Sequence, residues 1–320
     1  MAGEGIGSHA QDLAGKLVVL FGGNGFLGTH VAQELLGRGA RLRIACRRPD
    51  RAFRLKTLAN LGQIQFVRAD IRRHEMLPGL VAGADGVVNL VGAFSGDLDA
   101  LHVRSAGALA AAAKAAGASA FVQISANGAD TASSADYART KAEGEAAVNA
   151  AFPGAAIMRP SVVFGPDDNF INMFARLIAM FPALPVFGPE ARLQPVFVDD
   201  VAEAVANAVA DPARLGSKTF ELVGPEVVTM LELNRRIAAA QGRRRLFAEL
   251  PDAVSGLIAA LPGTPISAAQ WALLRAGNVG TGLPGLKALG VTARPLGLFL
   301  ERWMVRFRTH GRFGSSHGVA

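Results

Sequence analysis

Residues 17–28 read LVVLFGGNGFLG and give the clearest indication of the fold class. The apolar run Leu17–Phe21 is typical of a buried strand, and after residue 28 the apolar residues Val31, Leu35 and Leu36 recur at helical spacing. Between the two stands a glycine-rich loop made of Gly22, Gly23, Asn24, Gly25, Phe26, Leu27 and Gly28. The stretch therefore predicts a strand, a tight loop and a helix.

Three regularly spaced glycines of this loop, Gly22, Gly25 and Gly28, have distinct roles in such a turn. The first permits the tight turn, the second lets the backbone approach a pyrophosphate, and the third allows close packing of the helix on the strand. The N-terminus of the helix adds N–H groups and a positive dipole. The glycine pattern alone also fits a turn without a ligand, but between a strand and a helix it predicts dinucleotide binding.

Further apolar runs follow, with helical segments between most of them. They cover residues 42–46, 64–67, 86–91, 120–125 and 155–159. Continuous apolar strands that alternate with helices predict a parallel sheet covered on both faces, so we expect an α/β fold with a doubly wound Rossmann sheet. Two more strands are expected at 194–198 and 219–223, with a helix at 201–210 between them.

The alternation is lost at 174–188 and after residue 224, where the chain looks helical or irregular. We therefore expect two parts. An NADP-binding Rossmann domain comprises residues 15–173 and 193–224. A smaller, mainly helical C-terminal lobe comprises residues 174–192 and 225–320. We expect it over the sheet edge where open α/β folds bind ligands.

The residues after the second expected strand indicate which nucleotide is bound. An acid at this place bonds the ribose 2′-hydroxyl of NAD, whereas here Arg47 and Arg48 occupy it. Two guanidinium groups match a 2′-phosphate, so we expect NADP(H) to be preferred over NAD(H). The alternative is that both are solvated loop charges. Asp70, ending the third strand, is expected at the adenine, and Val91 and Gly92 at the middle of the cofactor.

Tyr137 is the only tyrosine of the chain and precedes Lys141 by four positions. On a helix such residues share one face, and a nearby ammonium group favours the phenolate and lowers the pKa of a tyrosine. The pair therefore fits an acid/base unit for hydride chemistry. The alternative is an amphipathic helix that carries both residues without a catalytic role.

Charge and cysteine content limit the function classes. Of the net charge of +7, the residues from 235 onward carry +9 and the first 234 carry −2. No recognition helix or zinc finger accompanies the basic third, so we expect no nucleic acid and favour docking to a membrane or an acidic partner. Cys46 is the only cysteine, which excludes a disulfide within the chain and a cysteine-based zinc site and suits a reducing cytosol.

The ends of the chain and its longest uncharged stretch bear on location. The first 16 residues resemble neither a secretory signal nor a transit peptide, so we expect a cytoplasmic protein, peripheral on the cytoplasmic face of the inner membrane at most. The uncharged stretch 253–274 contains Pro262, Gly263 and Pro265 and fits two short buried helices better than a membrane span.

Taken together, the glycine loop, Asp70, the Tyr137/Lys141 pair and the motifs at 159–166 and 198–201 resemble the extended and atypical short-chain dehydrogenase/reductases. The resemblance implies that Tyr137 is the catalytic acid/base, that Lys141 binds the nicotinamide ribose and tunes the tyrosine, and that a Ser or Thr after the fifth strand holds the substrate oxygen. The further cofactor contacts that it implies are Ile71, Ser125, Pro160 and Val162.

One position departs from that pattern. Ala126 stands where the active hydroxyl is expected, and Ser125 before it replaces that hydroxyl only if the strand end is shifted. Tyr137 follows Ala126 by 11 positions, a shorter connection than the sugar-modifying members have. Whether the protein is an enzyme therefore stays open at this point.

Motifs at 151–153, 164–170, 194–198 and above all 283–291 resemble the nucleotide-binding accessory subunit family of respiratory complex I, whose members are NAD-dependent epimerase/dehydratase-like. The resemblance implies a tightly bound NADPH of structural use, in a subunit beside the quinone-reducing part of complex I near the membrane. Related proteins are associated with ubiquinone synthesis.

A basic amphipathic helix is expected near 295–309. Its apolar stripe consists of Leu296, Phe299, Leu300, Trp303, Met304 and Phe307, and its basic residues lie off the stripe. Such a helix can lie on an anionic bilayer or pack on the smaller lobe of its own chain.

Two functions follow from these residues. The first is an NADP(H)-binding accessory or assembly subunit associated with complex I or a quinone-related complex. The second is an active NADP-dependent oxidoreductase or epimerase on a hydrophobic, quinone-like or isoprenoid substrate.

Overall fold

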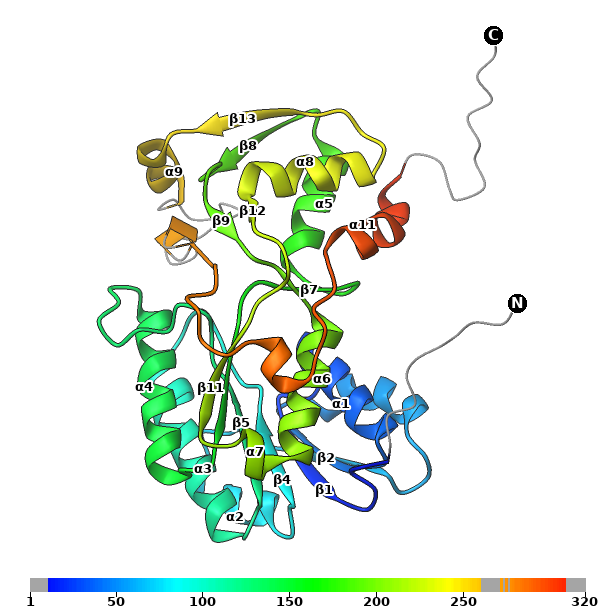
Figure 1. Cartoon of the computed structure of the whole chain (residues 1–320), viewed down its shortest axis with the longest axis vertical. Helices are drawn as coiled ribbons and strands as arrows, with labels where there is room; N and C mark the ends of the chain where they lie inside the picture. Colours follow the sequence, from blue (N-terminus) through cyan, green and yellow to red (C-terminus); the bar gives the residue numbers. More distant parts are fainter. Residues whose placement is uncertain (1–10, 260–270, 273, 276, 309–320) are drawn as a thin grey trace.

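A seven-stranded parallel sheet in the order β11-β6-β5-β4-β1-β2-β3 forms the centre of the computed structural model, which describes residues 11–259, 271, 272, 274, 275 and 277–308 (Figure 1). Its strands are β1 (Leu17–Phe21), β2 (Arg41–Cys46), β3 (Ile64–Arg68), β4 (Gly86–Asn89), β5 (Ala120–Ile124), β6 (Ala156–Pro160) and β11 (Lys218–Leu222). Every pair in this sheet is parallel. The expected Rossmann sheet is confirmed, and the strand order reverses beside β1, where such folds bind ligands.

Helices cover both faces of the sheet, as its continuous apolar strands require. On one face lie α1 (Phe26–Gly37) and α6 (Val198–Ala210), and on the other lie α2 (Leu77–Val81), α3 (Ser105–Ala115) and α4 (Asp136–Ala151) (Figure 1). Shorter turns complete this part: η1 (Pro49–Leu58), η2 (His74–Met76), the π-helical η3 (Asp99–Arg104), α7 (Pro212–Leu215) and η4 (Leu286–Leu289).

A second apolar cluster forms the smaller lobe. Its elements are α5 (Phe170–Met180), β8 (Ala183–Phe187), β9 (Arg192–Leu193), β12 (Val228–Thr229), α8 (Met230–Ala240), β13 (Leu246–Leu250), α9 (Asp252–Ala259), α11 (Gly297–Met304) and η5 (Val305–Phe307). The short pair β7 (Val163–Phe164) and β10 (Val196–Phe197) lies between this lobe and the central sheet (Figure 1).

Two expectations about the elements are wrong. The segments expected to be helical or irregular contain β8 and β13, which pair with each other over five residues each, and local periodicity cannot show a pairing between such distant segments. The strand expected at 194–198 is reduced to β10, which has two residues and pairs with β7 outside the central sheet.

The C-terminal helix expected near 295–309 corresponds to α11, which continues as the 3₁₀ turn η5.

The end of the chain returns to the central sheet. Leu286, Leu289 and Val291 pack in the same apolar core as β1, α1 and α6. The division into two domains drawn from the sequence stays a prediction, and these residues belong to its C-terminal part.

Part of the uncharged stretch 253–274 can be followed. Its first residues form α9, whereas 260–270, with Pro262, Gly263 and Pro265, lie outside the described residues. Within the described part of the chain, no helix has the length and apolar character needed to cross a bilayer.

Candidate nucleotide-binding site

The glycine loop between β1 and α1 has the geometry that its sequence predicts. Gly22 has φ +82°, which favours glycine, and a Cβ at Gly28 would lie 2.4 Å from the carbonyl oxygen of Gly22. A Cβ at Gly25 would meet only that same oxygen, at 3.4 Å. Gly28 thus permits close packing of α1 on the loop, and Gly25 leaves one side open for a phosphate group.

The N-terminus of α1 faces the same loop. Gly25 is its N-cap, and none of the described side chains caps its first N–H groups. These N–H groups and the helix dipole form an anion-binding site where the loop sequence predicts the pyrophosphate.

Beside the loop lies a strongly basic cavity of about 450 Å³ lined by Asn24, Arg47, Arg48 and Arg68. Arg68 was not identified from the sequence; it ends β3 and pairs in register with Cys46, so its guanidinium group lies next to Arg47. None of the three arginines makes an ion pair with a carboxylate of the described residues. The cavity therefore has three arginines and one nearby carboxylate, Asp70, whose charge acts on Arg47, so it keeps an excess of positive charge at the place expected for a 2′-phosphate.

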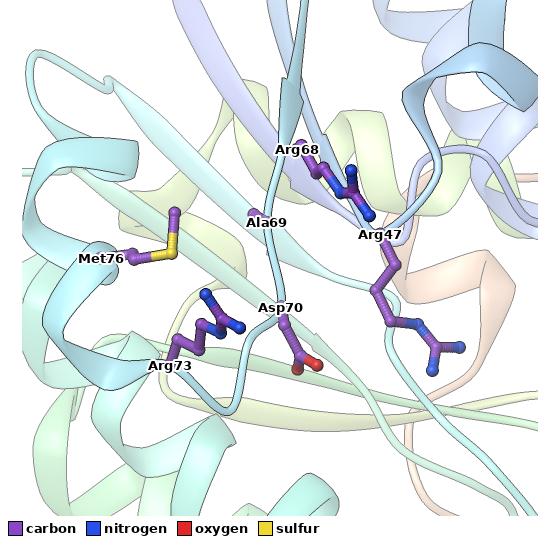
Figure 2. Close-up of a pocket in the computed structure, with 6 residues that line it drawn as sticks. All are labelled: Arg47, Arg68, Ala69, Asp70, Arg73 and Met76. Atoms are coloured by element: carbon purple, nitrogen blue, oxygen red, sulfur yellow. The ribbon is translucent and has the colours of Figure 1, made fainter.

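A second cavity of about 460 Å³ adjoins the first and shares Arg47 and Arg68 with it (Figure 2). Its other lining residues are Ala69, Asp70, Arg73 and Met76. Asp70, just after the end of β3, thus lines a cavity together with Arg47 and Arg68, and its expected role at the adenine stays a prediction. Arg73 and Met76 were missed, because they follow in a turn without a strand or helix signal of its own.

Asp70 is ionised in this cavity. Its carboxylate accepts hydrogen bonds from the Arg72 guanidinium group at 3.0 and 2.6 Å, which lowers the pKa of Asp70 to about 2. An ionised carboxylate accepts hydrogen bonds only, so it suits an amino group such as that of adenine.

Tyr137 lies in the first turn of α4, among aromatic rings. The ring of Phe94 stacks on it with centroids 4.5 Å apart, and His102 contacts it edge-on at 5.7 Å. The Nζ atom of Lys141 lies 5.9 Å from the centre of the Tyr137 ring, on the shared face that the spacing predicts. The structure therefore brings the pair together.

The acid/base properties of this pair differ from the expectation. Burial raises the pKa of Tyr137 to about 12, so the expected lowering by Lys141 is wrong for the protein without nucleotide. Burial also lowers the pKa of Lys141 to about 8, against the attraction of Glu145. The physical reason is that desolvation disfavours both charged forms more than the two residues stabilise each other.

Lys141 and Ser125 are held by other partners within the protein. The ammonium group of Lys141 donates to the carbonyl oxygen of Ile124 at 3.1 Å. The Ser125 hydroxyl donates to the Glu145 carboxylate, which Arg159 also binds, at 2.9 and 2.7 Å. Ser125 is buried, so its hydroxyl serves this ion pair, and Ala126 after it supplies none.

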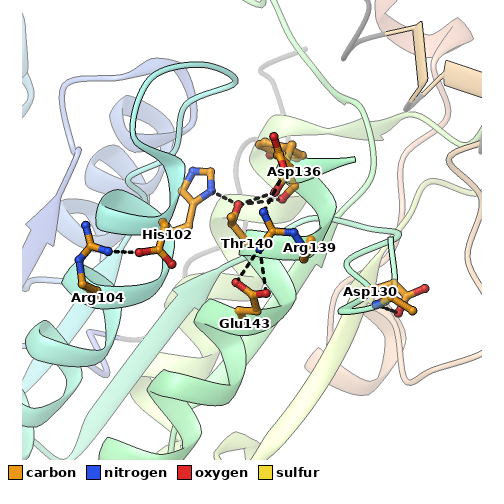
Figure 3. Close-up of polar contacts among 10 residues, drawn as sticks. His102, Arg104, Asp130, Asp136, Arg139, Thr140 and Glu143 are labelled. Carbon is orange, nitrogen blue, oxygen red and sulfur yellow. Dashed lines mark hydrogen bonds and ion pairs between the residues drawn. The ribbon is translucent and has the colours of Figure 1, made fainter. Parts of the chain in front are cut away.

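His102 is a buried residue near Tyr137 that the sequence did not reveal (Figure 3). Its Nε2 accepts a hydrogen bond from the backbone N–H of Ala93 at 3.2 Å, which assigns the proton to Nδ1. Nδ1 then donates to the Thr140 hydroxyl at 3.0 Å, which donates to the Asp136 carbonyl oxygen at 2.7 Å. Burial, and then Lys141, lower the pKa of His102 to about 4. No spacing signal marks it, because its partner Thr140 is 38 residues away.

The remaining expected cofactor residues lie at the carboxyl ends of the strands. Val91 donates its N–H to the Asn89 side chain at 3.1 Å, and a Cβ at Gly92 would lie 3.2 Å from Nζ of Lys141. The carbonyl oxygen of Pro160 accepts from Asn127, and the Val162 N–H donates to Asn278 at 3.0 Å. Ile71, directly after Asp70, is buried. Their roles toward a cofactor stay predictions.

The apolar stripe of the C-terminal helix packs on the smaller lobe. Leu296, Leu300 and Met304 are buried in its core, and Phe299 stacks on Phe197 with ring centroids 4.0 Å apart. Trp303 stacks on Phe299 in turn, at 5.4 Å. Of the two alternatives for this stripe, packing on the protein's own lobe is therefore the one that the structure has.

Comparisons with known proteins agree with this geometry. The model of the NAD dependent epimerase/dehydratase family matches residues 18–223. The NADH dehydrogenase [ubiquinone] 1 alpha subcomplex subunit 9, mitochondrial, of Rattus norvegicus is 33% identical over 316 residues, which cover 94% of this chain and 82% of the rat protein. A ceramide reductase of Caulobacter vibrioides is 32% identical over 248 residues, 76% of each chain.

Among solved structures, the triphenylmethane reductase of Citrobacter sp. in complex with NADP(H) superimposes with a TM-score of 0.73. It is 19% identical in sequence, and the match covers 89% of this chain and 99% of the reductase. At this identity the likeness shows the fold.

Proposed function

Because the chain belongs to the NAD dependent epimerase/dehydratase family and to the branch that contains the complex I subunits, we propose that it is an accessory or assembly subunit that holds NADP(H) for structure. One observation carries the proposal. Arg47, Arg48 and Arg68 line a cavity and make no ion pair among the described residues, whereas the polar groups around Tyr137 already have partners within the protein. Such a site is suited to retain a nucleotide rather than to turn it over.

The preference for NADP(H) over NAD(H) is part of the proposal. Three guanidinium groups around one cavity suit a dianionic 2′-phosphate, and Asp70 does not replace them, because Arg72 binds its carboxylate. Arg47, Arg48 and Arg68 would hold the 2′-phosphate, the loop at Gly25 the pyrophosphate, and Lys141 the nicotinamide ribose.

The proposed partner is respiratory complex I or a quinone-related complex. The support is the similarity to the rat subunit, which extends over 94% of this chain and so includes the smaller lobe. We further propose a peripheral position on the cytoplasmic face of the inner membrane, with the basic C-terminal part toward the lipid, because the residues from 235 onward carry the excess positive charge.

A second candidate function rests on Tyr137, Lys141 and the similarity to a ceramide reductase. In a reduction, bound NADPH would supply the hydride. Tyr137 would donate its proton to the carbonyl oxygen of a hydrophobic substrate, and Lys141 would stabilise the phenolate left behind. A pKa near 12 makes Tyr137 a poor proton acceptor at neutral pH, and Ala126 removes the second donor to that oxygen, so we place this function second.

Affinity purification of the tagged full chain from native membranes tests the first function. We expect NADPH in the purified sample, together with complex I or quinone-synthesis proteins, and the same result for Tyr137→Phe. If the chain co-purifies with none of these proteins, the accessory function is wrong. If Tyr137→Phe abolishes a cellular activity while NADPH and partners are retained, the reductase function replaces it.

A further inference from the structure

The smaller lobe has one corner where basic and apolar side chains meet at the surface. The helices α5, α8 and α11–η5 all end there, and the loop from α8 to β13 closes it at the upper right of Figure 1, above α11. We define the basic corner as Met180, Phe181, Arg243, Arg244, Arg245, Leu246 and Arg308.

Hydrogen bonds place these residues together. Leu246 donates its N–H to the carbonyl oxygen of Pro182 at 3.1 Å, next to Phe181, and Arg245 donates to the carbonyl oxygen of Ile178 at 2.8 Å, two residues before Met180. Arg243 donates to the Phe307 carbonyl oxygen at 3.1 Å, and Arg308 to that of Ala240 at 3.0 Å. The corner is thus one continuous surface built from three helix ends.

The arginines of the corner have no acidic partners. Arg243, Arg245 and Arg308 donate to carbonyl oxygens of the helix ends, and Arg244 is exposed. None of the four makes an ion pair with a carboxylate of the described residues. The nearest acid along β13, Glu249, faces Arg235 at 3.9 Å instead. Helix C-termini attract cations, but four arginines at one corner leave an excess of positive charge at the surface.

Apolar side chains stand among these charges. Met180 is 71% exposed, Phe181 47% and Leu246 75%, in a chain whose other aromatic side chains mostly pack inside the lobe. Exposed Met, Phe and Leu beside arginines are the composition of surfaces that insert into the headgroup region of anionic membranes. An acidic protein would account for the charge, whereas the exposed apolar tips favour lipid.

We propose that the basic corner binds the surface of a membrane that contains anionic phospholipids, with Met180, Phe181 and Leu246 inserted between headgroups and Arg243, Arg244, Arg245 and Arg308 at the phosphates. This inference rests on the proposed peripheral position and assigns it to particular residues. The apolar stripe of the C-terminal helix packs on the smaller lobe, so the proposed lipid-facing surface is the basic corner and not this stripe.

Vesicle flotation of the purified full chain tests the inference. We expect binding to phosphatidylcholine vesicles that contain about 30% phosphatidylglycerol, none to phosphatidylcholine alone, and release by salt. Arg244→Gln, at an exposed residue that caps no helix, should weaken binding about fivefold. Met180→Ser/Leu246→Ser should weaken it roughly tenfold through lost apolar burial. The matched control Arg41→Gln/Leu61→Ser changes an exposed arginine and an exposed leucine in the Rossmann part and should bind unchanged.

The inference is overturned if the corner variants bind vesicles as well as the control does, or if both kinds of vesicle bind equally. It is also overturned if the chain binds no vesicles but binds an acidic protein, and Arg244→Gln abolishes that binding. Bound NADPH is measured in the same samples. If the wild-type chain contains NADPH but does not bind vesicles, only the lipid surface is refuted. If it binds vesicles but contains no NADPH, only the proposed cofactor role is refuted.

Discussion

The two ends of the candidate nucleotide site differ in how their polar groups are used. At the adenine end, Arg47, Arg48 and Arg68 line two adjoining cavities and make no ion pair with a carboxylate of the described residues. At the nicotinamide end, Lys141, Ser125 and His102 are hydrogen-bonded within the protein, and Phe94 covers the ring of Tyr137. Groups that must reorganise before they can act contribute little to a transition state, whereas open cations bind an anion directly. The difference indicates a site built to retain a nucleotide.

The largest effect is expected at the loop that both ends share. Gly28→Val should weaken NADPH binding by at least about 100-fold, because its side chain would collide with the Gly22 carbonyl oxygen and close the phosphate site. The measurement is the rise in thermal unfolding midpoint when NADPH is added to protein refolded without nucleotide, and this rise should disappear in Gly28→Val.

Gly37→Ala is the matched control in the same helix, where a Cβ meets nothing within 4 Å. It should keep the full NADPH response and gain about 0.4–1 kcal/mol in the free energy of unfolding. An undiminished NADPH response in Gly28→Val would show that the nucleotide does not bind at this loop.

Charge reversal at the adenine end should change cofactor choice. For Arg47→Glu/Arg48→Glu we expect the ratio of NADP to NAD affinity to fall roughly 10–100-fold per arginine, since each charge-assisted hydrogen bond to the 2′-phosphate is lost. Calorimetric titration of protein refolded without nucleotide, with NADP and with NAD, measures this ratio, and Arg41→Glu, at the other end of β2, is the control. An unchanged ratio would contradict the 2′-phosphate assignment.

At the nicotinamide end, His102 should make stability depend on pH. Its pKa is lowered to about 4, so the folded protein binds fewer protons than the unfolded chain as the pH falls below the ordinary value of 6.5. Stability from the neutral imidazole is therefore present above pH 6.5 and lost toward pH 4, by about 3 kcal/mol.

Urea unfolding across that range, with His102→Gln and the exposed control His74→Gln, isolates this contribution. We expect the acid loss to shrink only in His102→Gln. Parallel pH profiles for all three proteins would mean that His102 is not held neutral.

The smallest effect concerns Phe94. Because Tyr137 is the only tyrosine, the ultraviolet absorbance of phenolate reports this residue alone. The titration midpoint should be near pH 12 in the wild-type chain and lower in Phe94→Ala, where the ring of Tyr137 gains solvent. Leu61→Ser, at an exposed side chain elsewhere, should leave it unchanged. A wild-type midpoint at or below 10 would restore Tyr137 as a candidate base.

The sequence was sufficient for the sheet, and it singled out several residues that line the two cavities at the proposed adenine end. The apolar runs and the glycine loop predicted all seven central strands, since their signals are local. Arg47, Arg48 and Asp70 follow directly from strand ends. Arg68 was missed because only the register of β3 against β2 brings it beside Arg47.

The nicotinamide end and the smaller lobe depend on contacts between distant segments. Spacing predicted that Tyr137 and Lys141 share a face, but not that Phe94 and burial would raise the pKa of the tyrosine. The pairing of β8 with β13 and the packing of the C-terminal stripe on Phe197 likewise join residues that no periodicity relates.

The central claim, that the protein retains NADPH rather than turning it over, is tested most directly by the fate of the nucleotide in the freshly purified full chain. The fluorescence of bound NADPH is followed after addition of excess unlabelled NADP and of quinone or long-chain ketone acceptors. We predict that the bound NADPH neither exchanges nor is oxidised over hours, in the wild-type chain and in Tyr137→Phe alike. Rapid oxidation by an acceptor in the wild-type chain, lost in Tyr137→Phe, would contradict it.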